Sequence, residues 1–169
     1  MSETTPGTAN NAPGQPLSRR LRELIVRAVA EAQNRNASLV EAEHLLLALT
    51  TAEDSPVQAV LAQAGLDTAG VDAALSAERA ASLRVAGVEP LPAERLVASP
   101  RVTRPRWGAS AKDVLVRAHK AAAAQRRQRS AEIDLLAGLF ALELGTVPRA
   151  LTLAGVDRPG LLAAARRAA

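Results

Sequence analysis

The chain of 169 residues contains no cysteine and no tyrosine, and its only Phe and Trp are Phe140 and Trp107. Without cysteine it forms no disulfide and has no thiol nucleophile. Because aromatic and β-branched residues are so few, Ala and Leu must build the core, and such a core suits closely packed helices better than sheets. The composition therefore predicts an all-α fold.

Long apolar runs are also missing. No stretch approaches the roughly 18 consecutive apolar residues of a membrane-spanning helix, and the N-terminus lacks the pattern of a signal peptide. Residues 1–16 (MSETTPGTANNAPGQP) hold almost no large apolar side chain, so they cannot bury enough surface to offset the entropy lost on ordering. We expect a disordered tail at 1–16, no membrane association and a cytoplasmic protein.

Residues suited to catalysis or metal binding are scarce. The only histidines are His44 and His119, and no His-x-x-x-His spacing occurs. We interpret the Glu43-His44 pair as a helix start, with Glu43 at the positive end of the helix dipole and His44 in a local hydrogen bond. An arginine-bearing partner would also need a carboxylate such as that of Glu43, so both interpretations stay open. We expect no enzyme activity, no catalytic residue, no metal site and no cofactor.

What the sequence does contain is an internal repeat. Glu43-His44-Leu45-Leu46-Leu47-Ala48-Leu49 returns as Ile133-Asp134-Leu135-Leu136-Ala137-Gly138-Leu139, at an offset of roughly 90 residues. At the same offset Arg22–Ala28 matches Lys112–Ala118, and Gly65-x-Asp67 matches Gly155-x-Asp157. We predict a tandem duplication of a four-helix unit, with repeat one at 17–82, a Pro-rich connector at 83–106 and repeat two at 107–169.

Each repeat carries helix-start signals followed by apolar residues at helical spacing. In repeat one they predict helices from Ser18 to about Asn34, from near Leu39 to about Thr51, from Ser55 to about Ala64 and from Asp67 to about Ala81. The second of these starts depends on a capping box, Ser38-Leu39-Val40-Glu41. In repeat two the first helix follows Trp107, and the later starts are Ser130 or Ala131, Thr146 and Asp157.

The formal net charge is +4, and basic residues cluster at Arg126–Arg129 and at Arg101, Arg104 and Arg106. A nucleic-acid surface needs basic residues gathered on one face, preferably with aromatic side chains for stacking. Aromatic residues are nearly absent, so we interpret these clusters as solvated loop charge or as docking sites for acidic partners. A basic helical DNA-binding or regulatory protein is the alternative.

The repeated motifs resemble the Clp N-terminal (Clp repeat) domain family, most closely its ClpC type, over residues 17–169. The likeness lies in an apolar residue and a hydroxyl before the first helix, then Glu-His-Leu-Leu-Leu-Ala-Leu, then Val-x-x-x-Leu-x-x-x-Gly-Leu-Asp. It implies a pseudo-twofold bundle of eight helices that binds Clp unfoldase or protease components, adaptors and substrates. No Gly-x-x-x-x-Gly-Lys-Ser/Thr motif of an ATPase occurs. We therefore expect a free-standing N-domain protein that serves as adaptor, as decoy or to sequester antibiotics.

The resemblance also implies binding positions. In ClpC-type domains a glutamate at the second helix and a threonine at the first serve phosphoarginine. Glu43 and Ser18 match these positions in repeat one, whereas Ile133 and Gly108 replace them in repeat two. The Gly-Thr that usually precedes the Glu-His pair is Glu41-Ala42 here.

Trp107 matches an aromatic residue that lines a surface for cyclic-peptide antibiotics such as cyclomarin, although a Trp at a helix entry also serves as a core staple. We expect a ligand groove between the repeats, floored near Leu17 and Trp107 and edged by Glu43 and basic side chains. The candidate peptide-binding residues are Leu17, Ser18, Arg22, Glu43, Trp107 and Lys112.

Overall fold

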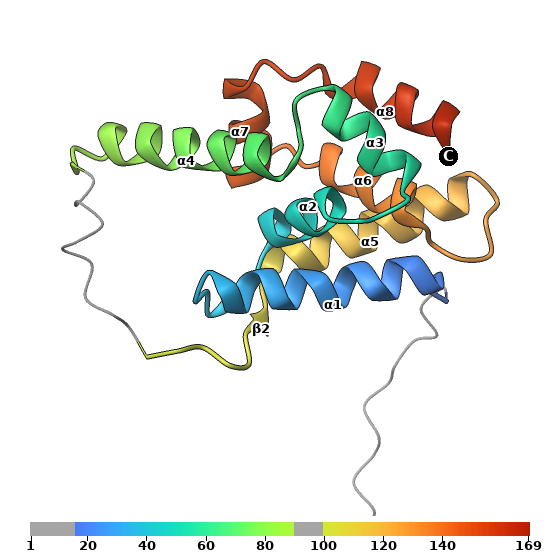
Figure 1. Ribbon diagram of the computed structural model, residues 1–169, viewed down its shortest axis with the longest axis horizontal. Coiled ribbons are helices and arrows are strands. Elements are labelled where there is room, and N and C mark those ends of the chain that lie inside the picture. Colours follow the sequence, from blue (N-terminus) through green and yellow to red (C-terminus); the bar gives the residue numbers. More distant parts are fainter. Residues whose placement is uncertain (1–15, 90–99) are drawn as a thin grey trace, which may run out of the picture.

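The computed structural model describes residues 16–89 and 100–169, which contain eight helices and two very short strands (Figure 1). Repeat one contributes α1 (Arg19–Asn34), β1 (Leu39–Val40), α2 (Ala42–Thr50), α3 (Pro56–Gln63) and α4 (Thr68–Val85). Repeat two contributes β2 (Arg106–Trp107), α5 (Ala109–Ala124), α6 (Glu132–Phe140), α7 (Thr146–Leu153) and α8 (Arg158–Ala168). The all-α prediction is confirmed. The tail at 1–15 and residues 90–99 of the connector lie outside the described residues.

The duplication is visible in the helix boundaries. Helices α5, α6 and α7 begin and end 90 residues after α1, α2 and α3, and α8 begins 90 residues after α4. The left-handed residues Asn36 and Arg126 share this offset, as do Gly65 and Gly155 after the third helix of each repeat. The same four-helix unit therefore occurs twice, as the internal repeat predicts.

Four of the eight predicted helix starts are confirmed by side-chain caps. Ser18, Ser55, Asp67 and Asp157 each accept a hydrogen bond from the backbone N–H three residues later, at 2.8–3.1 Å. The predicted start of the second helix is wrong. Leu39 and Val40 form a strand instead, the N-cap is Glu41, and the Glu41 N–H donates to His44 Nδ1 at 2.9 Å.

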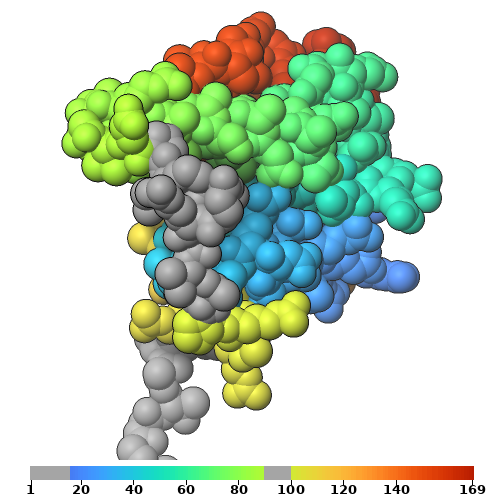
Figure 2. Space-filling model, turned by 60° about the vertical axis from the view of Figure 1, so that its left-hand side comes forward, coloured from blue at the N-terminus to red at the C-terminus, as the bar shows by residue number. Residues whose placement is uncertain are grey.

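The fourth helix is longer than predicted. It runs to Val85 rather than ending near Ala81, and so extends past the predicted limit of repeat one at residue 82. Val85 is 91% exposed, so the last turn of α4 projects from the body of the protein. Figure 2 shows α4 as a ridge, with the C-terminal helices on one side of it and α1 on the other.

The two repeats exchange backbone contacts at the starts of their helices. Val40 pairs in parallel with Trp107, and Leu17 forms a bridge to Ser130. The chain entering the first helix of each repeat is therefore held by the chain entering the second helix of the other repeat. This exchange gives the bundle its pseudo-twofold arrangement.

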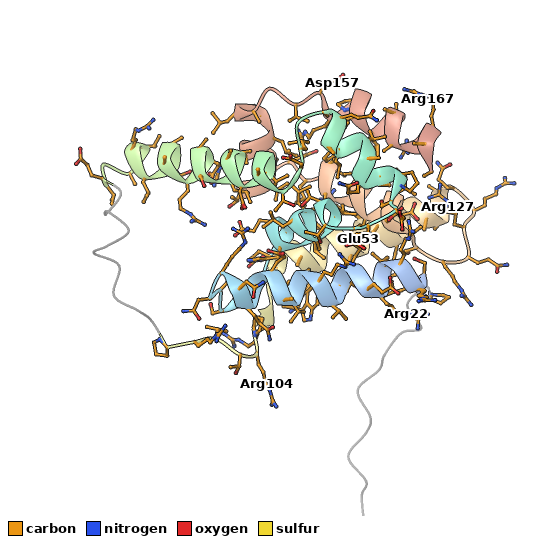
Figure 3. All side chains as sticks on the ribbon, in the orientation of Figure 1. Arg22, Glu53, Arg104, Arg127, Asp157 and Arg167 are labelled. Carbon is orange, nitrogen blue, oxygen red and sulfur yellow. The ribbon has the colours of Figure 1, made fainter. Side chains whose placement is uncertain are left out.

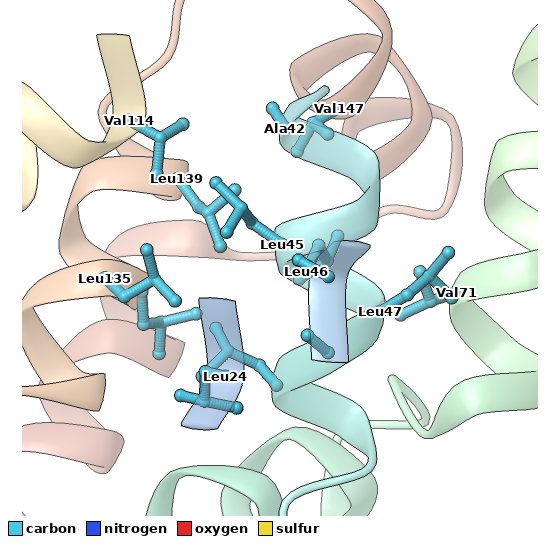
Figure 4. Packing of buried hydrophobic residues seen from close by; sticks show 14 of the residues in the cluster. Leu24, Ala42, Leu45, Leu46, Leu47, Val71, Val114, Leu135, Leu139 and Val147 are labelled. Atoms are coloured by element: carbon cyan, nitrogen blue, oxygen red, sulfur yellow. The ribbon is translucent and has the colours of Figure 1, made fainter. Parts of the chain in front are cut away.

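The second helix of each repeat forms the centre of the core. In α2 every residue except Glu43 is buried, and in α6 every residue is buried. Leu45 of α2 lies beside Leu139 of α6 (Figure 4), and Leu46 and Leu135 belong to the same core cluster. Phe140, predicted as a core residue, is 8% exposed.

The outer helices join the two repeats in the same crossed manner, since α3 packs on α8 and α4 packs on α7. The buried Glu78 of α4 accepts hydrogen bonds from Ser82 at 2.6 Å and from Arg149 of α7 at 2.8 Å. Burial by itself would raise the pKa of Glu78, but these two hydrogen bonds and the positive charges of Arg149 and Arg79 together hold the pKa below its ordinary value. None of the helices in the described residues is long and apolar enough to cross a membrane.

Because both repeats share one core, we expect them to unfold together. Leu46→Ala, at a position 1% exposed, should lower the free energy of unfolding by about 2–5 kcal/mol through loss of packing and the cavity left behind. Far-UV circular dichroism and the fluorescence of Trp107, the single Trp, should report coincident transitions. Leu153→Ala, at a position 57% exposed, is the control and should change little. Two separate transitions would contradict a shared core.

Candidate functional site

Glu43 is the one residue of α2 that escapes burial, and it lies between two cavities. The first, of about 300 Å³, is lined by residues that include Arg35, Glu43, Asp72 and Arg79, and we call it the mixed-charge pocket. The second, of about 360 Å³, is lined by residues that include Glu41, Glu43, Ser110, Leu144 and Pro148, and we call it the acidic pocket. Glu43 therefore forms a wall common to both.

The acidic pocket joins the two repeats. Glu41 and Glu43 come from the start of α2, Ser110 from the start of α5, and Leu144 and Pro148 from the loop before α7 and from α7 itself. The described residues that line this pocket include two carboxylates and no Lys, Arg or His. Leu144, at the edge of this pocket, is 86% exposed. The pocket thus combines negative charge with an apolar edge.

The Glu43 carboxylate lacks a hydrogen-bond or ion-pair partner within the described residues. In the mixed-charge pocket Arg35 is paired instead with Asp72 at 2.7 Å and with Glu31 at 3.6 Å. Burial raises the pKa of Glu43, although the positive charges of Arg79 and Arg35 oppose that rise. A cationic group that entered the acidic pocket would therefore meet a carboxylate still in need of a partner.

His44 makes the local hydrogen bond that the sequence predicts at this helix start. Its Nδ1 accepts the Glu41 N–H, and Asp134 Oδ2 accepts the Ala131 N–H at the matching place in repeat two, both at 2.9 Å. Burial lowers the pKa of His44, and the charge of Arg35 adds to this effect. The described residues contain no cluster of three or more His, Asp or Glu that could hold a metal ion.

Glu41 connects the starts of α2 and α5. Its Oε2 accepts a hydrogen bond from the Ser110 N–H at 3.1 Å and another from the Ser110 hydroxyl, whose Oγ in turn accepts the Ala42 N–H at 2.8 Å. The N-cap of α5 is Gly108, which has no side chain to perform this task. The carboxylate of Glu41 therefore caps α5 from the other repeat, where the helix dipole favours negative charge.

The predicted groove floored by both Leu17 and Trp107 is not formed. Leu17 lies at the N-terminal end of α1, whereas the segment leading to Trp107 contacts the C-terminal end, where Gln33 Nε2 donates to Thr103 O at 2.6 Å. The 16 residues of α1 span about 24 Å, so Leu17 and the contact of Gln33 with Thr103 lie at opposite ends of this helix. Arg22 and Arg104 mark these opposite ends (Figure 3). The prediction is wrong because the chain before α1 pairs with the chain before α6, and the chain before α5 pairs with the chain before α2. The entries to α1 and α5, which hold Leu17 and Trp107, therefore do not pair with each other.

The same exchange separates Ser18 from Glu43. Ser18 lies beside the start of α6, with its N–H donating to Ser130 O at 3.0 Å, while Glu43 lines a pocket with the start of α5. The position that matches Glu43 in repeat two is Ile133, which is buried. Each end of the bundle therefore keeps only one of the two residue types that the resemblance associates with phosphoarginine.

The remaining candidates lie outside the two cavities. Trp107 is partly buried against the core and lines neither of them, and Arg22 and Lys112 are exposed on α1 and α5. Glu41, Ser110 and Leu144 were missed. Glu41 could have been found from the sequence, because it replaces the glycine usual in the family. Ser110 could not, because its position depends on the pairing between repeats.

Glu43 should reduce stability at neutral pH. Because its pKa is raised in the folded chain, the folded state binds its proton more tightly than the unfolded state, and ionisation costs folding free energy. Glu43→Gln should therefore raise the free energy of unfolding at pH 7, and this gain should vanish below pH 4.5, the ordinary pKa of the group. Urea unfolding at several pH values tests this, with the exposed Glu53→Gln as control. A Glu43→Gln protein less stable than the native one at pH 7 would refute it.

Glu41 should have the opposite effect on stability. Glu41→Ala removes the cap of α5 and should lower the free energy of unfolding by about 1 kcal/mol. Glu41→Gln should lose less, because an amide oxygen can still accept the Ser110 N–H. Urea unfolding at pH 7 measures both, and equal losses for the two variants would show that the hydrogen bond contributes nothing.

Comparison with known proteins supplies the family. The model of the "Clp repeat (R) N-terminal domain" matches residues 16–104, and no curated protein matches. Among solved structures, the chain is similar to the N-terminal domain of the caseinolytic protease associated chaperone ClpD from Arabidopsis thaliana. That match has a TM-score of 0.62 and 21% identity over 93% of this chain and 96% of the other, so it shows the fold, repeat two included. The chain belongs to the Clp N-terminal domain family.

Proposed function

We propose that this protein is a protein-binding module of Clp-dependent regulated proteolysis, and that its acidic pocket binds an arginine or lysine side chain of its partners. Family membership supports the coarser half of this proposal, a Clp-related protein-interaction module. Binding of an arginine or lysine side chain is supported by the Glu43 carboxylate, which lacks a partner in the described residues. It lies in a pocket with a second carboxylate, and none of the described residues that line this pocket is a cation. The protein binds its ligand without changing it chemically.

The pocket matches such a side chain along its whole length. A guanidinium or ammonium group would pair with Glu43, whose burial makes an ion pair stronger than one on the surface. Arginine has the advantage of a planar fork that pairs with a carboxylate through two hydrogen bonds. The aliphatic stem would lie along Leu144 and Pro148 at the apolar edge.

In a cell this binding would serve one of two roles. The protein would present bound proteins to a Clp machine as an adaptor, or compete with the N-domains of that machine as a decoy. Cyclic-peptide antibiotics are a second proposed ligand, supported by the partly buried Trp107 in β2. Because Trp107 lines neither pocket, cyclomarin would bind independently of Glu43.

Peptide binding tests the proposal. A fluorescein-labelled, unstructured peptide with one arginine should bind the native protein at least tenfold more tightly than the same peptide with citrulline, whose side chain is neutral. In the Glu43→Gln protein that difference should disappear, because the paired charge is gone. Fluorescence anisotropy at fixed ionic strength measures both affinities.

The matched control is Glu53→Gln, which removes an exposed carboxylate in the loop between α2 and α3. It should bind both peptides as the native protein does. Equal affinity of the native protein for the arginine and citrulline peptides would rule out the pocket as a cation site, and loss of the difference in Glu53→Gln would show that only net charge matters.

A further inference from the structure

The N-terminus of α5 already holds an anion, and that anion belongs to the chain itself. Helix N-termini bind anions because their backbone N–H groups are unpaired and the helix dipole is positive there. At α5 the Glu41 carboxylate fills this position, accepting both the N–H and the hydroxyl of Ser110. The occupied position opens on the same pocket as Glu43.

Residues 41 and 108 form a complementary pair. A Cβ atom at Gly108 would lie 2.0 Å from Glu41 Oε1, so a side chain at 108 would require the Glu41 carboxylate to leave its present position. The α5 helix can be capped by its own residue 108 or by Glu41 from the other repeat, but not by both as they stand. In this chain Glu41 from the other repeat caps α5.

The opposite end of the bundle shows the alternative arrangement in the same fold. Ser18, at the position that matches Gly108, caps α1 with its own hydroxyl, which accepts the Leu21 N–H at 3.1 Å. Ala131, at the position that matches Glu41, has no carboxylate to offer. A carboxylate reaching the N-terminus of a first helix from the other repeat is thus a feature of the Glu41 end and is not required by the fold.

We propose that Glu41 is an internal anion that determines the charge of the ligand: it keeps the N-terminus of α5 closed to ligand anions, so that the acidic pocket accepts an unmodified arginine and rejects an arginine that carries a phosphate. This deepens the proposed function and rests on it for the arginine. A phosphate near α5 would have to displace the Glu41 carboxylate or lie beside it and Glu43, and like charges at such short range repel strongly. Without the Glu41 side chain, the same N–H groups become free for a phosphate next to Glu43.

The test compares the native protein with Glu41→Gly and Glu41→Gln, and takes Glu53→Gln as control. Each protein is titrated with the arginine peptide, with the phosphoarginine peptide of the same sequence and with inorganic phosphate. The native protein and the control should bind the arginine peptide at least tenfold more tightly than the phosphoarginine peptide. Glu41→Gly should reverse this order, because its α5 N-terminus is open.

Inorganic phosphate separates this inference from the proposed function. Followed by the NMR shift of the Ser110 amide, phosphate should saturate Glu41→Gly and leave the native protein unchanged, whatever the arginine peptide does. Glu41→Gln keeps the hydrogen bond without the charge, and its phosphoarginine affinity should fall between the other two. Circular dichroism confirms folding, and Glu41→Ala replaces Glu41→Gly if that variant unfolds, because Ala131 occupies the matching position in repeat two.

Two results would overturn the inference. One is a native protein that binds the phosphoarginine peptide as tightly as the arginine peptide. The other is an equal phosphate-induced shift of the Ser110 amide in the native and Glu41→Gly proteins.

Discussion

The exchange of backbone contacts between the two repeats is the constraint on which the rest of this structure depends. Leu17 pairs with Ser130 and Val40 pairs with Trp107, so the entry to the first helix of each repeat is fixed by the other repeat. The outer helices repeat this crossing, with α3 on α8 and α4 on α7. Each four-helix unit therefore depends on the other to fix the entry to its first helix and to cover its outer helices. The crossing also decides which side chains meet: Glu43 faces the start of α5, and Ser18 faces the start of α6.

Duplication has given the fold one equivalent position at each end of the bundle. Glu43 occupies this position at one end and Ile133 occupies it at the other. Ile133 fills its position with buried apolar surface, which stabilises the fold through the hydrophobic effect. Glu43, at the equivalent position, carries a charge that burial makes costly. A residue that is unfavourable for folding, and whose counterpart shows that the fold works without it, points to selection for binding rather than for stability. The asymmetry between the repeats thus locates the proposed site more clearly than the overall fold does.

The sequence predicted the elements well and their assembly poorly, for identifiable reasons. Caps such as Ser55 and Asp67 act within three residues, so local sequence determines those helix starts. The capping box at Ser38 failed because Leu39 and Val40 pair with a strand more than 60 residues away, and tertiary pairing overrode the local signal. The groove between Leu17 and Trp107 failed for the same reason. The sequence gives Glu43 two possible roles, but its neighbours Ser110 and Leu144 come from the other repeat and are not adjacent in any sequence pattern.

Electrostatics explains why two carboxylates can share the acidic pocket at all. The N-termini of α2 and α5 meet there, joined by the hydrogen bonds of Ser110 to Glu41 and of Ala42 to Ser110. A carboxylate at a helix N-terminus gains about 0.3–1 kcal/mol from the dipole, so each helix end offsets part of the cost of one carboxylate. Glu41 has hydrogen bonds in addition, whereas Glu43 has only the dipole and the distant charges of Arg79 and Arg35. Glu41 therefore has hydrogen-bond donors within the described part of the chain and Glu43 does not, and this difference makes Glu43 the residue whose charge a ligand cation would balance.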